Sequence, residues 1–481
     1  MLNFIKEKII SRWYIILPAI LLFIYIILRA VSLSFTHDEA FTFLNYVTRP
    51  SSEIINVNYT NNHLLNSLLT RIAFLLFGSS EFSLRLPNVL AAILFIFYLI
   101  KLLLKILPGK ITWLLAFVAI TLNSFQDEFF GLCRGYGLSL GLIMMSFYFI
   151  YRYVSEQRSV RLVFISILCM FLATLANYSI LIMFLIHVTA VLYLEIKRLQ
   201  TSRENKLLQI KRRNIKSVIL LLSSVVFAFI LLKLIVRINA AGNDNFNFGG
   251  TKGFWQDTVC SLVSSSCISE WRILYHWTGE LFPVFMTGFV IIVFVIASGL
   301  LLKRILLNAH SANNLFSFYL FVLLTGCGSA IWLMNVILKI PFSTDRVAIY
   351  FIPVFSLFVC SILLSEGNSS RIRKGLACLF FIHPVFSFCI GMNLHISENW
   401  KFNANNADAF NIIISDSEKQ KCSGAHYIVS TDYLMYPVYD YYRFRFQKSI
   451  LSEVVYSECG FRNGSDFYLG NSDPGISFEK I

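Results

Sequence analysis

Long apolar runs separated by short polar segments are the dominant pattern along the chain. A membrane core about 30 Å thick is crossed by a helix of about 20 mainly apolar residues. The pattern therefore predicts an all-α polytopic membrane protein with about 11 transmembrane helices. The expected spans are 13–35, 82–107, 111–126, 134–151, 160–176, 178–196, 216–237, 282–302, 315–338, 346–364 and 375–393.

Composition agrees with a membrane location. Of the 481 residues, 57% are hydrophobic and 14% are charged, whereas soluble domains average about 45–50% apolar and about 25% charged residues. These values exclude a soluble globular enzyme, a disordered chain and a coiled coil. The first apolar run is too long for a cleaved signal peptide and has no small-residue cleavage pattern, so it is expected to remain as a span.

The net charge of +14 would suit a nucleic-acid-binding protein, but its distribution along the chain does not. If the N-terminus lies inside the cell, 22 of the 41 lysines and arginines fall on inner segments, as the positive-inside rule requires. The most basic segment, 197–216, is then a cytoplasmic loop. We expect a multi-pass protein of the inner (plasma) membrane with its C-terminus outside and no nucleic-acid partner.

This topology places four polar segments on the outer face: 36–81, 126–133, 238–281 and a tail from about 394. We expect a transmembrane domain over 1–393 and a small exoplasmic α/β domain over 394–481. Within the tail, 425–431 is expected to form a strand, and 433–444 a helix or a second strand.

Cysteines on the predicted outer face could form disulfides, because oxidation is allowed there. The candidate pairs are Cys260–Cys267 and Cys422–Cys459, although a sequence cannot fix the connectivity. The chain has no Cys or His spacing typical of a metal site. No cofactor is therefore expected, and metal dependence stays open.

The first outer segment begins with two adjacent acids, Asp38 and Glu39, directly after the first span. Carboxylates at a membrane surface are costly and need a reason. Thr36 and Glu39 fit a helix capping box, in which Gln serves as well as Glu. Asp38 is not needed by the box, so we expect Asp38 to act in catalysis and Glu39 to be a secondary catalytic acid that also shapes the turn.

Residues 64–77 have apolar positions at helical spacing but are too few for a span. We expect an interfacial amphipathic helix lying flat on the outer surface. His63 stands at its start and could bind substrate in an active-site cleft. The alternative is a polar cluster that only begins the helix.

Three further side chains at the outer ends of spans could bind substrate: Arg134, Tyr136 and Arg346. Arg134 and Tyr136 alternate with glycines, which allow close approach of a ligand or backbone. Two arginines on one side of the membrane could hold one phosphate by charge-assisted hydrogen bonds. Arg29, near the outer end of the first span, is expected to snorkel toward water instead.

These motifs together resemble the polytopic glycosyltransferases of the GT-C superfamily. The resemblance rests on the Asp-Glu pair, the His before an interfacial helix, the segment FGSSEFSLRLPNVLA (77–91) and the Arg-Gly-Tyr step at 134–136. The nearest branches are the protein O-mannosyltransferases and the aminoarabinose transferases. The resemblance covers residues 1–240 well, matches DRVAIYFIPVF (345–355) more weakly and leaves the tail almost unmatched.

The resemblance implies an enzyme that takes a sugar from a lipid-phosphate donor on the outer face. It assigns the catalytic position to Asp38, the companion acid to Glu39, and donor-site positions to His63 and Arg134. Its partners would be a polyprenyl-phosphate sugar, membrane lipid and a glycan, lipid or protein acceptor. This chain departs from the better-known branches at Gly135, where they have Pro, and His37 precedes the acidic pair where they vary.

The chemistry of such a donor fits the candidate residues. A phosphate leaving group is already anionic and needs cationic stabilisation more than a general acid, whereas an acceptor hydroxyl needs a carboxylate base. A single displacement would invert the anomeric carbon of the transferred hexose or pentose. The chain has no P-loop, GxGxxG or DxD-type motif for a nucleotide sugar.

The outer segment 238–281 is rich in glycine and contains Phe246, Phe248 and Trp255. It could be a mobile lid whose aromatic rings stack on sugar, or an ordinary flexible loop. Two other functions compete with a transferase: a transporter or flippase for a lipid-linked glycan, and an oligosaccharide polymerase or ligase. A transporter would carry ionisable residues at mid-membrane, and a polymerase would more often have its large outer loop late in the chain.

Overall fold

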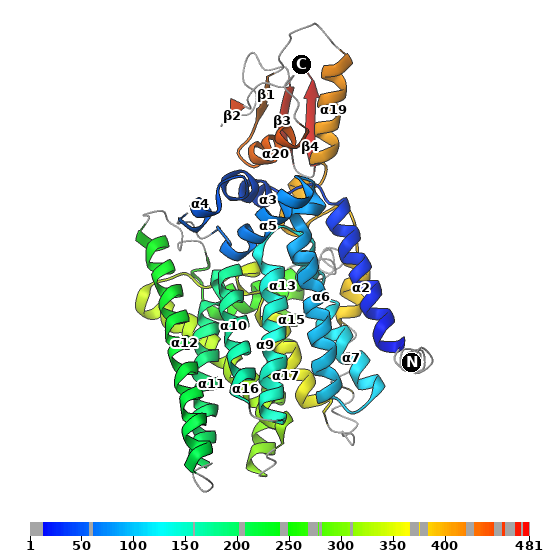
Figure 1. Cartoon of the computed structure of the whole chain (residues 1–481). Coiled ribbons are helices and arrows are strands. Elements are labelled where there is room, and N and C mark those ends of the chain that lie inside the picture. The colour runs from blue at the N-terminus through cyan, green and yellow to red at the C-terminus, as the bar shows by residue number, and fades with distance from the viewer. Residues whose placement is uncertain are drawn as a thin grey trace, which may run out of the picture.

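The structure is a computed structural model of the chain (Figure 1). It describes residues 13–56, 61–156, 159–201, 207–240, 249–267, 278, 281–307, 311–365, 375, 383–419, 428–446, 455–456, 467–472 and 475–480.

Seven helices in the described part of the chain are long and apolar enough to cross a membrane. They are α2 (Trp13–Ser32), α6 (Glu81–Ile106), α9 (Gly135–Ser155), α11 (Leu181–Thr201) with the turn η3 (Tyr178–Ile180), α12 (Leu207–Ala240), α15 (Leu281–Leu306) and α16 (Ala312–Leu338). Shorter apolar helices occupy three more of the expected spans: α7 (Lys110–Thr121), α10 (Val160–Ala176) and α17 (Phe351–Leu363). The last expected span, 375–393, is described mainly from 383, with a helix over 383–391.

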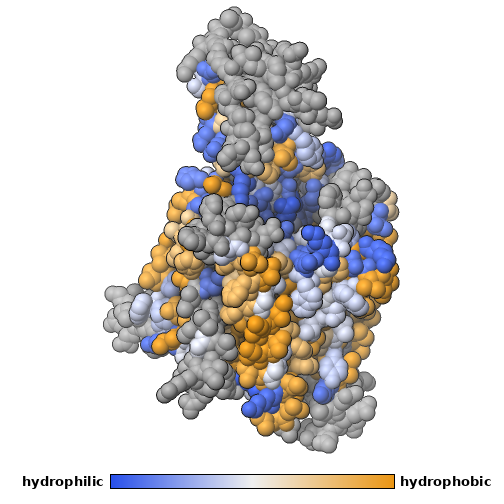
Figure 2. All heavy atoms as spheres, turned by 180° about the vertical axis from the view of Figure 1, so that it is seen from behind, coloured by the Kyte–Doolittle hydropathy of each residue, from blue (hydrophilic) through white to orange (hydrophobic). Residues whose placement is uncertain are grey.

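The surface of this bundle carries a belt of large apolar side chains. Leu21 on α2, Phe229 on α12 and Phe285 on α15 are each more than half exposed. Figure 2 shows such hydrophobic surface over much of the helical body, with hydrophilic surface gathered nearer the tail. Since exposed apolar residues suit lipid rather than water, the fold is that of a multi-pass membrane protein, as expected from the sequence.

Helix α9 lies at the centre of the bundle, with nearly all of its residues buried. Its main neighbours are α6 and α10. Two glycines allow this close packing. A Cβ on Gly141 would lie 2.7 Å from the carbonyl oxygen of Ala91 on α6, and a Cβ on Gly135 would clash with the carbonyl oxygen of Ala176 on α10. The outer end of α9 begins at Arg134, so tight packing of this helix fixes the position of that side chain.

The first outer segment folds into α3 (His37–Thr42), the π-helix η1 (Phe43–Val47), α4 (Ser51–Asn56) and α5 (Leu64–Phe77). Helix α5 is the helix expected at 64–77. Its polar residues Asn66, Ser67 and Thr70 are buried against the protein, while Leu75 and Leu76 are 65% and 68% exposed. An apolar outward face is what a helix at a lipid interface requires.

Short elements connect the spans on the same side. The turn expected at 126–133 consists of α8 (Ser124–Glu128) and η2 (Phe129–Gly131). The later outer segment forms η4 (Phe254–Cys260) and α13 (Ser261–Ser266), and η5 (Asp345–Ala348) precedes α17. Residues Phe246 and Phe248 lie outside the described part of the chain.

The tail contains η6 (Glu398–Asn403), α19 (Asn406–Lys419), α20 (Tyr436–Phe446) and a four-stranded sheet. The strands are β1 (Val429–Thr431), β2 (Val455–Tyr456), β3 (Phe467–Ser472) and β4 (Gly475–Lys480), in the spatial order β2-β1-β3-β4. Strand β1 pairs parallel with β2 and β3, and β3 pairs antiparallel with β4. The strand expected at 425–431 is therefore present over 429–431, and 433–444 is mainly helical.

The tail sits on the first outer segment (Figure 1) and shares a hydrophobic core with it. Phe35 stacks on Tyr441 at 4.0 Å between ring centroids, and Phe43 meets Phe444 edge-on at 5.2 Å. The boundary expected at residue 393 falls close to where the chain leaves the last helix. The shared core ties the tail closely to residues near Asp38.

The candidate disulfide Cys260–Cys267 is not formed in the structure. The two residues stand seven positions apart along the continuous helical segment η4–α13. A helix rises about 1.5 Å per residue, so their Cα atoms lie well beyond the roughly 7 Å limit for a disulfide. Cys422 and Cys459 lie outside the described residues.

Candidate active site

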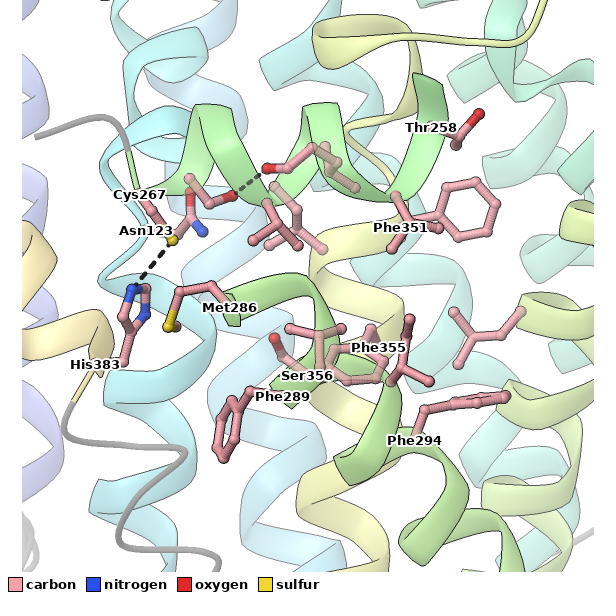
Figure 3. Close-up of a pocket in the computed structure, with 18 of the residues that line it drawn as sticks. Asn123, Thr258, Cys267, Met286, Phe289, Phe294, Phe351, Phe355, Ser356 and His383 are labelled. Atoms are coloured by element: carbon pink, nitrogen blue, oxygen red, sulfur yellow. Dashed lines mark hydrogen bonds between the residues drawn. The ribbon is translucent and has the colours of Figure 1, made fainter. Parts of the chain in front are cut away.

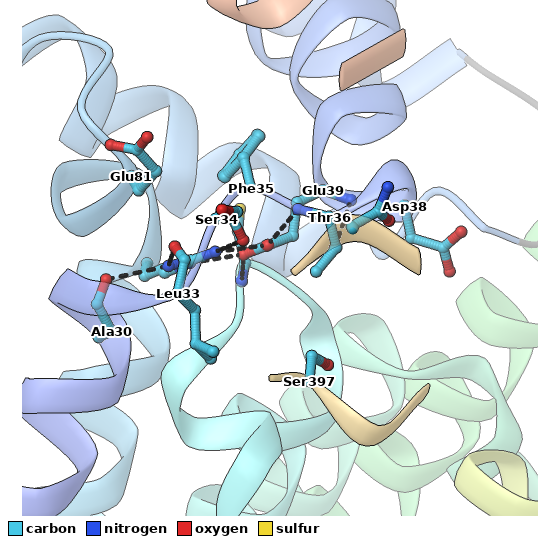
Figure 4. A network of polar contacts seen from close by, with 12 residues as sticks. Ala30, Leu33, Ser34, Phe35, Thr36, Asp38, Glu39, Glu81 and Ser397 are labelled. Atoms are coloured by element: carbon cyan, nitrogen blue, oxygen red, sulfur yellow. Dashed lines mark hydrogen bonds and ion pairs between the residues drawn. The ribbon is translucent and has the colours of Figure 1, made fainter. Parts of the chain in front are cut away.

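The two adjacent acids of the first outer segment point to different sides of the α3 turn (Figure 4). Thr36 is the N-cap of α3, and the capping box with Glu39 is complete in both directions. Neighbouring helical residues project about 100° apart. The Glu39 side chain therefore points into the protein, whereas the Asp38 side chain remains partly exposed to solvent. The structure thereby assigns the two carboxylates to different surroundings.

Glu39 is fully buried and accepts hydrogen bonds on both oxygens. Its Oε1 accepts from Arg85 Nε at 2.8 Å and from the Cys133 backbone N–H at 2.6 Å. Its Oε2 accepts from an Arg85 terminal nitrogen at 2.8 Å and from the Thr36 backbone N–H at 3.0 Å. All four acceptor positions are filled, so Glu39 serves as a structural anchor in this arrangement.

Arg85, on α6, is the partner that sequence reasoning missed. Its side chain is fully buried and also donates to three carbonyl oxygens at the end of α2, those of Ala30, Leu33 and Ser34. One guanidinium thus joins the first span, the second span and the α3 turn. Fixing this turn fixes the direction of the neighbouring Asp38 side chain.

Asp38 lies between two arginines from distant parts of the chain. Its carboxylate is 3.5 Å from a terminal nitrogen of Arg134 and 3.2 Å from one of Arg346, and the side chain is 21% exposed. Burial acts to raise the pKa of Asp38, but Arg134 and Arg346 outweigh it and hold the pKa below its usual value. Asp38 is therefore ionised at neutral pH.

The two arginines differ in access. The Arg134 side chain is 4% exposed and donates to Thr42 Oγ1 at 3.0 Å, whereas the Arg346 side chain is 33% exposed. A phosphate arriving from outside would reach Arg346 more directly than Arg134. Arg134 is placed to hold Asp38 and the α3 turn together.

Arg346 is also enclosed by aromatic groups. Its guanidinium carbon lies 4.7 Å from the ring centroid of Trp400, and the Tyr136 side chain lies close to it. Trp400 comes from the tail, and sequence reasoning missed it because the tail matched no motif. Tyr136 is buried, and its ring contacts those of His63 and Phe129.

His63 lies behind these residues rather than in open solvent. It is buried, its Nδ1 is 2.9 Å from the Ala176 carbonyl oxygen, and its Nε2 lacks a partner among the described residues. Burial lowers the pKa of His63 well below its usual value, and the neighbouring Arg134 adds to this effect. His63 is therefore neutral, and its ring packs edge-on against Tyr136 at 5.1 Å.

The close packing of α9 against the end of α10 requires a glycine at position 135. A Cβ at this position would lie 1.7 Å from the Ala176 carbonyl oxygen. Any larger residue would have to push α9 away from the end of α10. A Cβ at this position would also lie 2.9 Å from the Cβ of His63, so the same close packing places His63 beside the start of α9, where Arg134 stands.

The expectation that Arg29 snorkels toward water is wrong. Its side chain is buried and donates to the carbonyl oxygens of Asn393 at 2.7 Å and Ile396 at 3.2 Å. It also lies 3.7 Å from the carboxylate of Glu128 on α8. Arg29 thus attaches the start of the tail to the first span.

An apolar pocket of about 230 Å³ lies among the helices, as the close-up in Figure 3 shows. Its walls come from η4, α13, α15 and α17, and include Phe289, Phe294 and Phe355. Helix α13 donates from Ser265 to the Asp345 carboxylate at 2.8 Å, directly beside Arg346. Trp255, one of the aromatic residues of the later outer segment, also lines this pocket.

At one end of the pocket the thiol of Cys267 lies 3.2 Å from His383 Nε2, as Figure 3 shows. Within the described residues, no group of three or more His, Cys, Asp or Glu side chains could hold a metal ion.

Comparison with solved structures places this arrangement among known folds. ArnT from Cupriavidus metallidurans, an aminoarabinose transferase, aligns in its apo state with a TM-score of 0.51 and 11% identity, over 90% of this chain and 84% of ArnT. The chain has the GT-C fold. The resemblance stated from the sequence motifs is confirmed at the level of the fold.

Two further structures are similar at lower scores. ArnT from the same organism bound to undecaprenyl phosphate gives a TM-score of 0.48 at 12% identity, over 89% of this chain and 83% of ArnT. The archaeal oligosaccharyltransferase AglB from Archaeoglobus fulgidus, in complex with an inhibitory peptide and a dolichol-phosphate, gives 0.40 at 12% identity, over 91% and 64%. No protein-family model matches the chain, and no curated protein matches it either.

Proposed function

We propose that this protein is an integral-membrane glycosyltransferase that moves a hexose or pentose from a polyprenyl-phosphate donor to an acceptor hydroxyl. Transfer would occur on the outer, periplasmic face of the inner membrane. The single observation that carries the proposal is the Asp38 carboxylate held between Arg134 and Arg346. The GT-C fold supports the same reaction class.

In the proposed reaction the acceptor hydroxyl attacks C1 of the sugar. Asp38 takes the hydroxyl proton, a bond forms between the acceptor oxygen and C1, and the bond from C1 to the phosphate oxygen breaks. The leaving polyprenyl phosphate keeps the electron pair, and Arg346 stabilises its added charge. One displacement of this kind inverts the anomeric carbon.

The arginine pair has two tasks in this scheme. Arg346, the more exposed, binds the donor phosphate. Arg134, which is buried, keeps Asp38 ionised and aimed, since an adjacent cation favours the charged form of a carboxylate. When the phosphate engages Arg346, Asp38 loses part of its counter-charge and becomes a stronger base.

The apolar pocket supports a lipid-linked donor. Its walls are mainly Phe, Val, Leu and Ile side chains, and α13, which forms one wall, also donates from Ser265 to Asp345 on the turn η5 that carries Arg346. A phosphate at Arg346 would therefore have an apolar surface nearby for the first part of its lipid chain. We propose that Tyr136 and His63 shape the donor side of this site.

The competing transporter function has less support. His187, inside α11, is the kind of buried ionisable residue that transporters use. Its ring nitrogens already have partners, however: Tyr319 Oη at 2.7 Å and Ser166 Oγ at 3.3 Å. This satisfied network packs helices together, while the polar cluster that reaches solvent lies at the outer end.

The proposal is tested by deleting the gene in its host and measuring lipid-linked sugars by mass spectrometry. We expect one polyprenyl-phosphate sugar to accumulate and its sugar to disappear from an envelope glycan, lipid or protein. The wild-type gene and the variant Glu53→Gln should restore the normal profile, because Glu53 is an exposed acid of the same outer segment. The variant Asp38→Asn should not. An unchanged lipid profile in the deletion strain would contradict the proposal.

A further inference from the structure

The indole ring of Trp400 is almost completely buried at the edge of the proposed active site. It is 3% exposed, and Arg346 lies over its ring. Trp400 also meets Phe129 edge-on at 6.3 Å, and Phe129 packs against Tyr136 at 4.9 Å. One aromatic layer therefore runs from the tail to the outer end of α9.

The backbone of η6 is bent at this residue. Trp400 has φ −135° and ψ 51°, which is not helical, while its neighbours follow a 3₁₀ path. The bend turns the indole inward, away from the polar side chains beside it in the sequence. Burial of this large indole ring in a mainly polar segment indicates that its contacts matter.

The segment before Trp400 is anchored to the transmembrane helices. Glu128 on α8 accepts hydrogen bonds from Ser397 Oγ at 2.5 Å and from the Glu398 backbone N–H at 3.0 Å. Arg29 on α2 donates to two carbonyl oxygens just upstream and lies 3.7 Å from Glu128. The position of Trp400 is thus set by the membrane bundle as well as by the tail.

We propose that Trp400 is a positioning residue that holds Arg346 in the orientation needed for the donor phosphate. This inference rests on the proposed function of Arg346. It adds that the start of the tail completes the site formed by α3, α9 and η5. The tail would therefore be part of the catalytic unit and not a separate accessory domain.

The physical reason lies in the competition for Arg346. Asp38 attracts the guanidinium at 3.2 Å. Without another contact, the Arg346 guanidinium would turn its N–H groups fully toward the Asp38 carboxylate. No N–H group would then remain for the phosphate, and Asp38 would be a weaker base. An indole ring binds the face of a guanidinium and leaves its N–H edge free for anions. Trp400 can therefore hold Arg346 beside Asp38 while one edge stays open to a phosphate.

The test measures binding of undecaprenyl phosphate to the full-length protein in lipid nanodiscs, with the neutral undecaprenol as reference. We expect Trp400→Leu to weaken undecaprenyl phosphate binding about tenfold and Trp400→Phe about threefold, since the Phe ring attracts cations less strongly than indole. Undecaprenol binding should not change. In an Arg346→Ala background, both Trp400 substitutions should cause no further loss.

Phe410→Leu is the matched control, because Phe410 is an equally buried aromatic residue of the tail that stacks on Tyr442 at 5.5 Å. It should lower thermal stability without weakening undecaprenyl phosphate binding. If Trp400→Leu fails to fold, the Trp400→Phe variant replaces it. Its loss of undecaprenyl phosphate binding is then compared in the wild-type and Arg346→Ala backgrounds.

Three results are distinguishable. Weaker binding in Arg346→Ala, with no added effect of Trp400 substitutions, supports the inference. Equal fold-losses from Trp400→Leu with and without Arg346, or no loss in Trp400→Leu, would overturn it while leaving the role of Arg346 intact. Wild-type binding in Arg346→Ala would instead remove the proposed phosphate site itself.

Discussion

Replacing Glu39 by Gln changes one atom of a buried carboxylate, yet we expect a large loss of stability. Four N–H donors converge on this group, two on each oxygen. Gln offers one oxygen and turns its own NH₂ group toward two of those donors. Two buried donors then lose their acceptor, and the Arg85 guanidinium loses its counter-charge.

The size of the effect follows from these contacts. Removing one partner of a buried ion pair typically costs about 3–5 kcal/mol, and each buried donor left without an acceptor costs about 1–3 kcal/mol. Arg85 keeps its three carbonyl acceptors at the end of α2. We therefore expect the free energy of unfolding to fall by about 3 kcal/mol, which is the lower end of the range for a broken buried ion pair. The capping box alone would have predicted a nearly neutral change.

The assay is the thermal unfolding midpoint of purified protein in detergent, together with turnover per folded molecule. Glu39→Gln should lower the midpoint clearly while folded molecules keep most of their turnover. Glu53→Gln, in the exposed pair with Arg49, should leave the midpoint unchanged. An unchanged midpoint with abolished turnover in Glu39→Gln would refute this reasoning and place Glu39 in the chemistry.

Five other predictions concern the site, the helix packing and the topology. Arg346→Ala should weaken undecaprenyl phosphate binding at least about tenfold, whereas Arg134→Lys should mainly lower turnover, because Lys lacks the planar fork that holds the α3 turn. The value of kcat/KM should stay flat from about pH 8 to about pH 5, since His63 is neutral and Asp38 ionised there, and should fall only toward the lowered pKa of Asp38. Gly135→Ala should reduce the folded yield, measured by size-exclusion chromatography, because its Cβ meets a carbonyl oxygen at 1.7 Å. A reporter fused after residue 481 should be active only if it functions outside the cytoplasm.

Local patterns in the sequence predicted local structure well. The spacing of apolar residues predicted most of the long helices, and the Thr36–Glu39 spacing predicted the capping box that the structure contains. Helix α7 ends earlier than expected, because Asn123 caps the new helix α8 within the expected span. Such caps are visible in the sequence but are easily overlooked inside an apolar run.

Contacts between distant segments could not be predicted in the same way. Glu39 and Arg85 are 46 residues apart, and an arginine near either end of a span looks the same in the sequence whether it snorkels or pairs. Arg29 was misassigned for this reason. Its partners, Asn393 and Ile396, lie more than 360 residues away.

The contribution of the tail was hidden for a different reason. Trp400 stands in a segment without a motif, and its role depends on a backbone bend and on Glu128. The signal that could have drawn attention to it is a lone tryptophan in an otherwise polar stretch. Such a residue needs burial somewhere, and here the outer end of the bundle provides it.

The most direct test of the account is a transfer assay with purified protein in proteoliposomes, using the polyprenyl-phosphate sugar that accumulates in the deletion strain. Release of polyprenyl phosphate should match sugar transfer to the acceptor one to one, with inversion at C1. Asp38→Asn should reduce the rate about 10²–10⁴-fold at an unchanged unfolding midpoint. Near-normal transfer by Asp38→Asn, or transport of the donor across the bilayer without transfer, would contradict the central claim.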